Sequence, residues 1–225
     1  MTGIWRIRKF GRWLAVLALA AGLAGCTTYR GETGNPFERA LTWFSYIGGE
    51  DIRASCRVNG IDRYRFVYNG HYRLEIRGYD LTPVGGGAEL TVRARGPGGN
   101  VKRLSFDEPF GPWSLEKDVA RITNRQAALI VRSLSDDAAA ALPAAGQSMQ
   151  SYDFFWIVSA CSQGRFRLNV FRWPKTDMNA LAFVPLLLEH DGSGVPFGKA
   201  RDIEGMQQYS FGVAINAAGD GLVGR

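Results

Sequence analysis

The histidines of this chain are the first residues to test for catalytic or metal-binding chemistry. There are two, His71 and His190, and His190 belongs to the sequence Glu189-His190-Asp191, which Gly-Ser-Gly follows. This serine has glycine directly on both sides, which is not the G-x-S-x-G pattern of a nucleophile elbow. A metal site needs more ligands at a fixed spacing, such as H-E-x-x-H or paired cysteines, and the sequence has neither. We therefore predict no catalytic residue, no metal and no cofactor.

The acidic residues give only a weak indication of glycoside hydrolysis. Two adjacent pairs occur, Asp107-Glu108 and Asp136-Asp137. Neighbours in sequence do not in general face each other across a substrate, as the two carboxyl groups of a glycosidase must do. A catalytic pair assembled from distant positions stays open at this point.

Arginine on one phase of the expected strands is the most distinctive pattern in the chain. Arginine binds carboxylate and phosphate through two parallel hydrogen bonds, so an arginine face with interleaved tyrosines could bind an anionic polymer, phosphate or lipid headgroups. The alternative is a solvated strand surface that also blocks pairing between sheet edges. The expected anionic-ligand face consists of Arg63, Arg65, Arg73, Arg77, Arg93, Arg95, Arg165 and Arg167.

The N-terminus has the pattern of an export signal. An apolar run from Trp13 to Ala24 is bounded by polar sequence on its C-terminal side, and no acidic residue precedes Cys26. A positive segment before a short apolar run that ends in small residues is typical of a secretory signal. The run is shorter than the roughly 20 residues that a membrane-spanning helix needs. The preceding cations are Arg6, Arg8, Lys9 and Arg12.

The end of this run resembles the lipobox of bacterial lipoproteins, in Leu23-Ala24-Gly25-Cys26. The resemblance implies that residues 1–25 are removed as a lipoprotein signal peptide and that Cys26 becomes the first residue of the mature chain, carrying acyl groups. Several acyl chains form a durable membrane anchor. Thr27 stands where an Asp would resemble an inner-membrane retention signal, so we expect the outer membrane, facing the periplasm. The alternative is an ordinary signal peptide with a chance cysteine.

The charge balance of the mature chain argues against nucleic-acid binding. The whole chain has 27 Lys and Arg, 21 Asp and Glu, and a formal net charge of +6. The signal segment holds four of those cations and no acid, which leaves the mature chain with about +2. A periplasmic location, as the lipobox implies, argues against nucleic acid as well.

With Cys26 acylated, as the resemblance implies, two cysteines remain, Cys56 and Cys161. Exported compartments are oxidising and an even number of cysteines suits a disulfide, so we predict a bond between them. It would close a long loop and stabilise the fold by roughly 4–5 kcal/mol on the chain-entropy model. The alternatives are two separate buried thiols or a catalytic Cys161, although the sequence places no histidine to activate it.

The mature chain divides into a polar tether, residues 26–36, and one β-rich globular domain, residues 37–225. Asn35-Pro36 is a helix-start signal, and residues 37–47 place apolar side chains on one helical stripe. This helix either docks onto its own domain, which we favour, or lies on lipid.

Alternating residues predict hairpins along most of the domain. For residues 63–81 the pattern favours a loop over 69–71 that sets Phe66 opposite Leu74. Residues 88–106 repeat the pattern, and a loop over 162–164 would pair Ala160 with Phe166. Further strands are expected at 183–191 and 207–216. A capping box at Thr123 begins a helix that runs to about Ala138, with a possible interruption at 135–137.

These elements predict an α+β fold: a mainly antiparallel sheet or sandwich of about eight strands built from hairpins, with one or two packed helices.

Three functions suit such a lipid-anchored protein. A non-catalytic interaction module would hold an envelope protein or an anionic glycan at the membrane. An envelope hydrolase of glycan or ester would bring Glu189, His190 or Asp191 to another acid or a serine. An accessory subunit without a ligand would expose an apolar patch. We predict the interaction or accessory module, with the hydrolase as the alternative.

Overall fold

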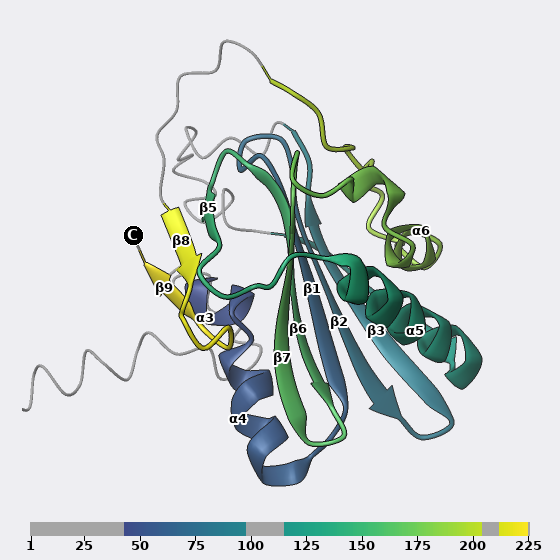
Figure 1. Cartoon of the computed structure of the whole chain (residues 1–225). Helices are drawn as coiled ribbons and strands as arrows, with labels where there is room; N and C mark the ends of the chain where they lie inside the picture. The colour runs from purple at the N-terminus through teal and green to yellow at the C-terminus, as the bar shows by residue number, and fades with distance from the viewer. Residues whose placement is uncertain (1–42, 98–114, 204–211, 225) are drawn as a thin grey trace, which may run out of the picture.

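The computed structural model describes residues 43–97, 115–203 and 212–224 (Figure 1). In these ranges the chain forms nine strands in two antiparallel sheets and four α-helices, which confirms the expected α+β class. The lipobox with Cys26, the helix start at Asn35-Pro36 and the strand expected at 101–106 lie outside the described residues. Within the described ranges, no helix is both long and apolar enough to cross a membrane.

A six-stranded antiparallel sheet is the centre of the fold, with the strand order β4-β3-β2-β1-β6-β7. Strand β1 is internal and pairs with both β2 and β6, so that Val67 lies opposite Gly78 on one side and Ile157 on the other. β4 and β7 form the two edges. The strands are β1 (Arg63–Gly70), β2 (Ile76–Val84), β3 (Gly87–Arg95), β4 (Glu116–Thr123), β6 (Phe154–Ser162) and β7 (Arg165–Arg172).

One face of this sheet is covered by α5 (Asn124–Ala140) and α6 (Phe183–Leu188), which lie to the right of the sheet in Figure 1. Phe66, Tyr68 and Trp156 form the centre of the core between them and are almost completely buried. The capping box that the sequence predicts is present: the Thr123 hydroxyl accepts the Gln126 amide, and the Gln126 side chain accepts the Thr123 amide. The expected interruption at 135–137 is absent, because α5 continues to Ala140.

The opposite face is covered by α3 (Trp43–Ile47), α4 (Glu50–Asn59) and a three-stranded sheet of β5 (Ser148–Gln150), β8 (Gly212–Ile215) and β9 (Leu222–Gly224). The sheet therefore has a layer on each side, and both phases of β1 are buried. The predicted disulfide joins Cys56 of α4 to Cys161 of β6, with Cα atoms 5.6 Å apart. It fixes this helical layer to the sheet covalently. A 3-10 turn, η2 (Met178–Ala180), precedes α6.

The predicted hairpins form, but with other registers. β1 and β2 are joined by residues 71–75 rather than 69–71, so Phe66 lies opposite Tyr79 and not Leu74. The β6–β7 loop has two residues, Gln163 and Gly164, both with positive φ, as a type I′ turn requires. Ala160 consequently pairs with Arg167 instead of Phe166.

The strand expected at 183–191 is also wrong, because residues 183–188 form α6. A short, continuously apolar run does not distinguish a buried strand from a buried helix. Pro185 lies in the first turn of this helix, where its missing amide hydrogen costs little. The Asp137 carboxylate accepts the Phe183 amide and so satisfies one of the free donors at the helix start.

Candidate functional site

The eight arginines of the expected anionic-ligand face do not share one surface, and that prediction is wrong as a description of a single face. The strand registers place Arg65 and Arg93 under the α3–α4 layer, whereas Arg77, Arg165 and Arg167 lie on the face that α5 and α6 cover. Two of them, Arg65 and Arg77, are buried, with 1% of each side chain exposed. Their partners show that they hold the fold together.

Arg65 is the centre of an ion-pair cluster, here called the Arg65 network, between the sheet and α4. Its guanidinium binds both carboxylate oxygens of Asp51 at 2.7 and 3.0 Å, and its Nε donates to Asp80 at 2.6 Å. Tyr46 of α3 stacks over the guanidinium at 4.0 Å and offers its carbonyl oxygen at 3.1 Å. Arg93 binds the second oxygen of Asp80 at 2.7 Å. The outermost member is Arg63, 3.6 Å from Asp51.

The Arg65 network holds three guanidinium groups and two carboxylates where water is largely excluded. Burial opposes the charged guanidinium, but the attraction of Asp80 and Asp51 outweighs it and raises the pKa of Arg65 above its ordinary value. Gly78 leaves room for Tyr46, since a Cβ at position 78 would lie 2.7 Å from the Tyr46 hydroxyl oxygen. That hydroxyl donates to Asp80 at 3.2 Å. The cluster therefore fixes α3 and α4 on the sheet.

Arg77 organises a second cluster, the Arg77 network, on the other face. Its Nε donates to Glu75 at 2.7 Å, its Nη1 binds Asp191, and its Nη2 donates to the Val195 carbonyl at 2.6 Å. The Tyr79 hydroxyl also donates to Asp191, at 2.7 Å. Burial opposes the charged guanidinium, but Tyr79, Glu75 and Asp191 together outweigh it and raise the pKa of Arg77. The network ties the segment that follows α6 to β2.

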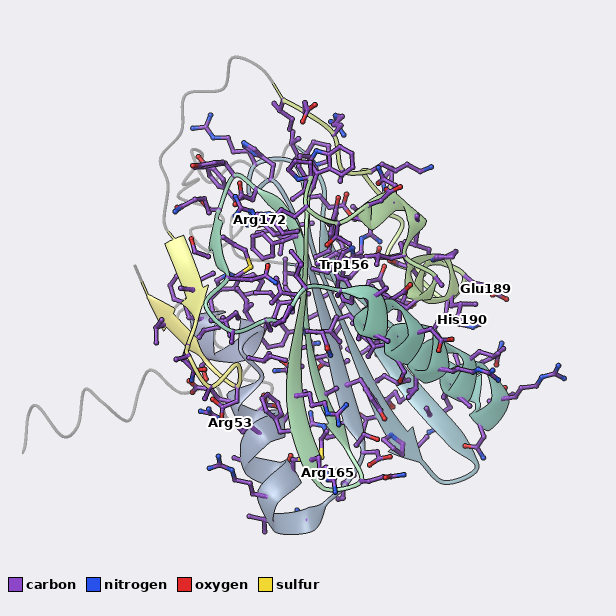
Figure 2. All side chains as sticks on the ribbon, in the orientation of Figure 1. Arg53, Trp156, Arg165, Arg172, Glu189 and His190 are labelled. Atoms are coloured by element: carbon purple, nitrogen blue, oxygen red, sulfur yellow. A yellow bond between two sulfur atoms is a disulfide. The ribbon has the colours of Figure 1, made fainter. Side chains whose placement is uncertain are left out.

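Glu189, His190 and Asp191 are separated by this arrangement. Asp191 turns inward to Arg77 and Tyr79, and its other oxygen accepts the Ser193 amide at 2.9 Å. These hydrogen bonds and the Arg77 charge outweigh burial and lower the pKa of Asp191. Glu189 and His190 point outward at the end of α6 (Figure 2). The hydrolase arrangement, in which the triplet meets another acid or a serine in one pocket, is therefore not supported by these contacts.

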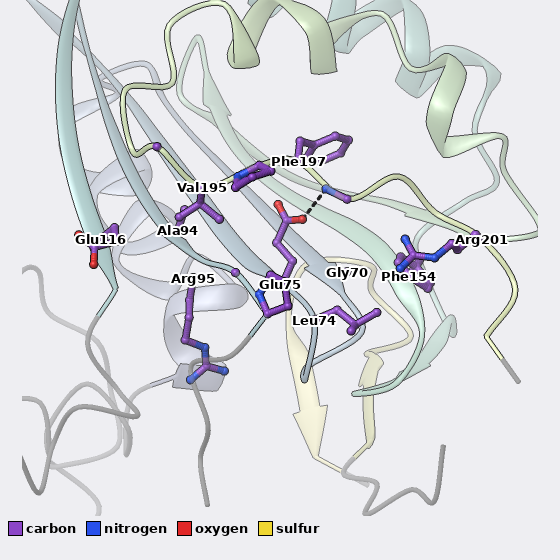
Figure 3. Close-up of a pocket in the computed structure, with 15 residues that line it drawn as sticks. Gly70, Leu74, Glu75, Ala94, Arg95, Glu116, Phe154, Val195, Phe197 and Arg201 are labelled. Atoms are coloured by element: carbon purple, nitrogen blue, oxygen red, sulfur yellow. Dashed lines mark hydrogen bonds between the residues drawn. The ribbon is translucent and has the colours of Figure 1, made fainter. Parts of the chain in front are cut away.

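A cleft of about 590 Å³ opens beside the Arg77 network, at the end of the six-stranded sheet (Figure 3). Residues 194–198 form one wall, and the other consists of the ends of β1, β3, β4 and β6 with the β1–β2 connection. Figure 3 shows Glu75 in the middle of the cleft, with Arg95 and Arg201 on opposite sides. Its apolar side chains include Leu74, Ala94, Phe154, Val195 and Phe197.

Glu75 is the buried acid of the cleft, and both of its oxygens are engaged. Oε1 accepts from Arg77, and Oε2 accepts the Gly198 amide at 2.6 Å. Burial raises the pKa of Glu75, while the Arg77 charge and the Gly198 amide act in the opposite direction. A Cβ at position 198 would lie 3.0 Å from Oε2, so a larger residue there would crowd the carboxylate. The carboxylate therefore shapes the cleft wall.

Sequence reasoning did not find the ion pairs of either network, and it considered Asp191 only as a candidate of the hydrolase alternative. Glu75 and Arg77 are two residues apart in an extended segment, which places both on one face and was the local signal available. Asp51 and Asp191 had no such signal, because their arginines lie 14 and 114 residues away.

The remaining arginines of the predicted set form two groups at opposite ends of the sheet. Arg73 is exposed in the β1–β2 connection and donates to the Tyr72 hydroxyl at 2.8 Å. Arg95 lines the cleft and reaches the Tyr72 carbonyl at 3.4 Å. Arg165 and Arg167 are exposed on β7, at the opposite end of the sheet from the cleft (Figures 1 and 2).

Across the described part of the chain, His, Cys, Asp and Glu side chains do not gather in threes that could hold a metal ion. No protein-family model matches the chain, and neither the curated proteins nor the solved structures give a match. The function of this fold has therefore to be inferred from its own residues.

Proposed function

We propose that this protein is a lipid-anchored lipoprotein of the cell envelope that acts as a non-catalytic interaction or accessory module, anchored through Cys26 and facing the periplasm. The lipobox pattern at residues 23–26 supports the anchor. A disulfide between Cys56 and Cys161 suits an oxidising compartment. In this proposal the cleft beside the Arg77 network receives an apolar side chain of an envelope protein.

The engagement of Glu75 is the observation that carries the proposal. A general acid or base must be within hydrogen-bond reach of a substrate and free to exchange a proton with it. In Glu75, by contrast, both carboxylate oxygens already accept hydrogen bonds, one from Arg77 and one from the Gly198 amide. The cleft thus offers a shaped, largely apolar wall around a carboxylate that is already paired, which favours binding over catalysis.

The chemistry of the rim indicates the kind of partner segment. Apolar walls suit one buried anchor side chain, the usual centre of a protein interface. Arg201 lines one side of the opening, and its charge suits an acidic residue beside that anchor. A partner segment with an aromatic or aliphatic residue next to an acidic one fits both features.

Photo-crosslinking from inside the cleft tests this proposal. A photoreactive phenylalanine analogue would replace Leu74, which lines the cleft, and in a matched control it would replace Leu129, which is 47% exposed on α5. We expect one dominant protein adduct from position 74 and none of the same size from position 129. Cys26→Ala should lower the adduct yield because the protein leaves the membrane. Intact mass of the wild type should show acyl groups on residues 26–225.

Equal adducts from both positions, or none from position 74, would contradict the proposal. Turnover of an ester or glycan substrate by the purified protein, lost in Glu75→Gln, would favour the hydrolase instead. An intact mass without acyl groups would contradict the lipid anchor at Cys26. The crosslinking result would then test the cleft alone.

A further inference from the structure

A second hollow lies far from the cleft, between α5 and strands β6 and β7. This α5–β7 groove has a volume of about 420 Å³ and is bounded by α5 from Val131 to Ala139 and by the strands from Ala160 to Asn169. In Figure 1, α5 crosses the sheet obliquely, so it covers the sheet face unevenly along its length. The helix contributes small side chains, Ser135, Ala138 and Ala139, which leaves the space open.

Two arginines project from β7 onto this groove. Arg165 and Arg167 are two residues apart in one strand, so they share the face of the sheet that α5 covers. Both are exposed, and neither guanidinium has a hydrogen-bond or ion-pair partner among the residues that the structure describes. This contrasts with Arg65 and Arg77, whose donors are used inside the protein.

Neutral hydrogen-bonding groups surround the arginines. Asn169, Gln163 and Ser162 come from β7, the turn and β6, and Ser135 comes from α5. The floor includes the ring of Tyr64, whose hydroxyl has a pKa raised by burial. The nearby acid is Asp62, which already accepts the Gln163 amide at 2.8 Å. The groove therefore combines two available cations with several amides and hydroxyls around a partly apolar floor.

We propose that the α5–β7 groove binds an anionic saccharide, with Arg165 and Arg167 taking its carboxylate or phosphate. Guanidinium groups bind either anion through paired hydrogen bonds. Amide and hydroxyl side chains suit the ring hydroxyls of a sugar, which are donors and acceptors at once. The volume lies in the range of small-ligand sites. This site is separate from the cleft and does not depend on the partner protein proposed for it.

Calorimetric titration of the full mature protein in detergent tests the assignment. The probes are trigalacturonic acid against neutral galactotriose, and glucose 6-phosphate against glucose. We expect at least one anionic probe to bind about tenfold or more tightly than its neutral counterpart, since one charged hydrogen-bonded contact contributes that much. Which anion binds distinguishes a carboxylated from a phosphorylated sugar. The preference should fall as salt is raised.

Two kinds of variant locate the binding. Arg165→Gln and Arg167→Gln should each weaken the anionic probe about tenfold, whereas Arg125→Gln, the same charge change in the exposed first turn of α5, should leave it unchanged. Ala139→Trp keeps every charge but fills the groove from an exposed helix position, and it should abolish binding. Urea unfolding of each variant checks that the fold is retained.

The proposal would be overturned if anionic and neutral probes bound equally tightly, or if no probe bound. An equal loss in Arg125→Gln, or unchanged binding in folded Ala139→Trp, would also overturn it. The groove variants should not alter the adduct formed from position 74, so failure at this site leaves the proposal for the cleft intact, and the reverse also holds.

Discussion

Arg65 and Arg77 are buried on opposite faces of two paired strands, and each attaches a different layer to the same sheet. Arg65 on β1 binds Asp51 of α4 with two hydrogen bonds, and Arg77 on β2 binds Asp191 beyond α6. The strands are hydrogen-bonded neighbours, so the two networks lie on opposite faces of the same pair of strands. Each layer can therefore be loosened separately by a single substitution.

Arg65→Met should lower the free energy of unfolding by about 3–5 kcal/mol, because it leaves Asp51 and Asp80 without their buried partner. Urea unfolding followed by tryptophan fluorescence measures the change. Arg63→Met is the matched control, since Arg63 lies 3.6 Å from Asp51 with 28% of its side chain exposed. Its loss should cost less than about 1 kcal/mol. Equal effects of the two substitutions would show that Arg65 is not the centre of the network.

Arg77→Met should act locally on the wall of the cleft. Without the guanidinium, Asp191 and the Val195 carbonyl lose a shared anchor, and Glu75 loses the charge that stabilises it. Hydrogen exchange should then accelerate at the amides of residues 192–198. In Arg65→Met the increase should instead be largest in α4. Uniform acceleration in both variants would contradict the separation of the two layers.

Removing the disulfide should destabilise the protein by about 4–5 kcal/mol on the chain-entropy model, because Cys56 and Cys161 are 105 residues apart. The double substitution Cys56→Ser and Cys161→Ser, made in a Cys26→Ala background, leaves no other thiol in the chain. Urea unfolding against the Cys26→Ala parent gives the difference. A change below about 1 kcal/mol would mean that the networks alone hold α4 in place.

Because of His71, the protein should become less stable as the pH falls below the pKa that this histidine has in the unfolded chain. His71 is buried, its Nδ1 accepts the Arg73 amide at 3.3 Å, and burial followed by the Arg73 charge lowers its pKa below 6.5. Between the folded and unfolded pKa values the unfolded chain binds more protons, so the free energy of unfolding declines as the pH falls through this window. Urea midpoints between about pH 7 and pH 5.5 measure it.

His71→Asn should flatten that decline. Asparagine tolerates the φ of 62° at this position, and its side-chain oxygen can replace Nδ1 as the acceptor. His190→Asn provides the control, because His190 is the other histidine of the chain and lies at the end of α6. If His190→Asn removed the pH dependence and His71→Asn kept it, the assignment would be wrong.

Local chemistry in the sequence predicted local structure well. The capping box at the start of α5 involves only Thr123 and Gln126, which are three residues apart. Both of its hydrogen bonds, each between a side chain and a backbone amide, are present. Alternation of apolar residues predicted hairpins at β1–β2 and β6–β7, and both exist. The single disulfide followed from cysteine number and compartment, and the structure joins the two cysteines.

Features that depend on distant partners could not be predicted in the same way. An arginine that alternates with aromatic residues indicates an exposed phase only if the second face of the sheet is open. Here α3 and α4 cover that face, and Asp51 neutralises Arg65 inside it. The β1–β2 register failed for a local reason, because residues 72–74 form a turn in which the Leu74 amide donates to the His71 carbonyl. Leu74 therefore lies in the connection, and Phe66 pairs with Tyr79 instead.

The internal position of β1 constrains how the chain can fold. Strands β1 to β4 pair with their immediate neighbours in sequence. The other edge of β1 pairs with β6, which comes much later in the chain, so that Val67 lies opposite Ile157. Contacts between such distant segments form slowly. Until β6 arrives, β1 presents an open and apolar strand edge, which is a template for pairing with other chains. We therefore expect a newly synthesised copy to expose this edge, and to need a chaperone, until β6 has been made and has paired with β1.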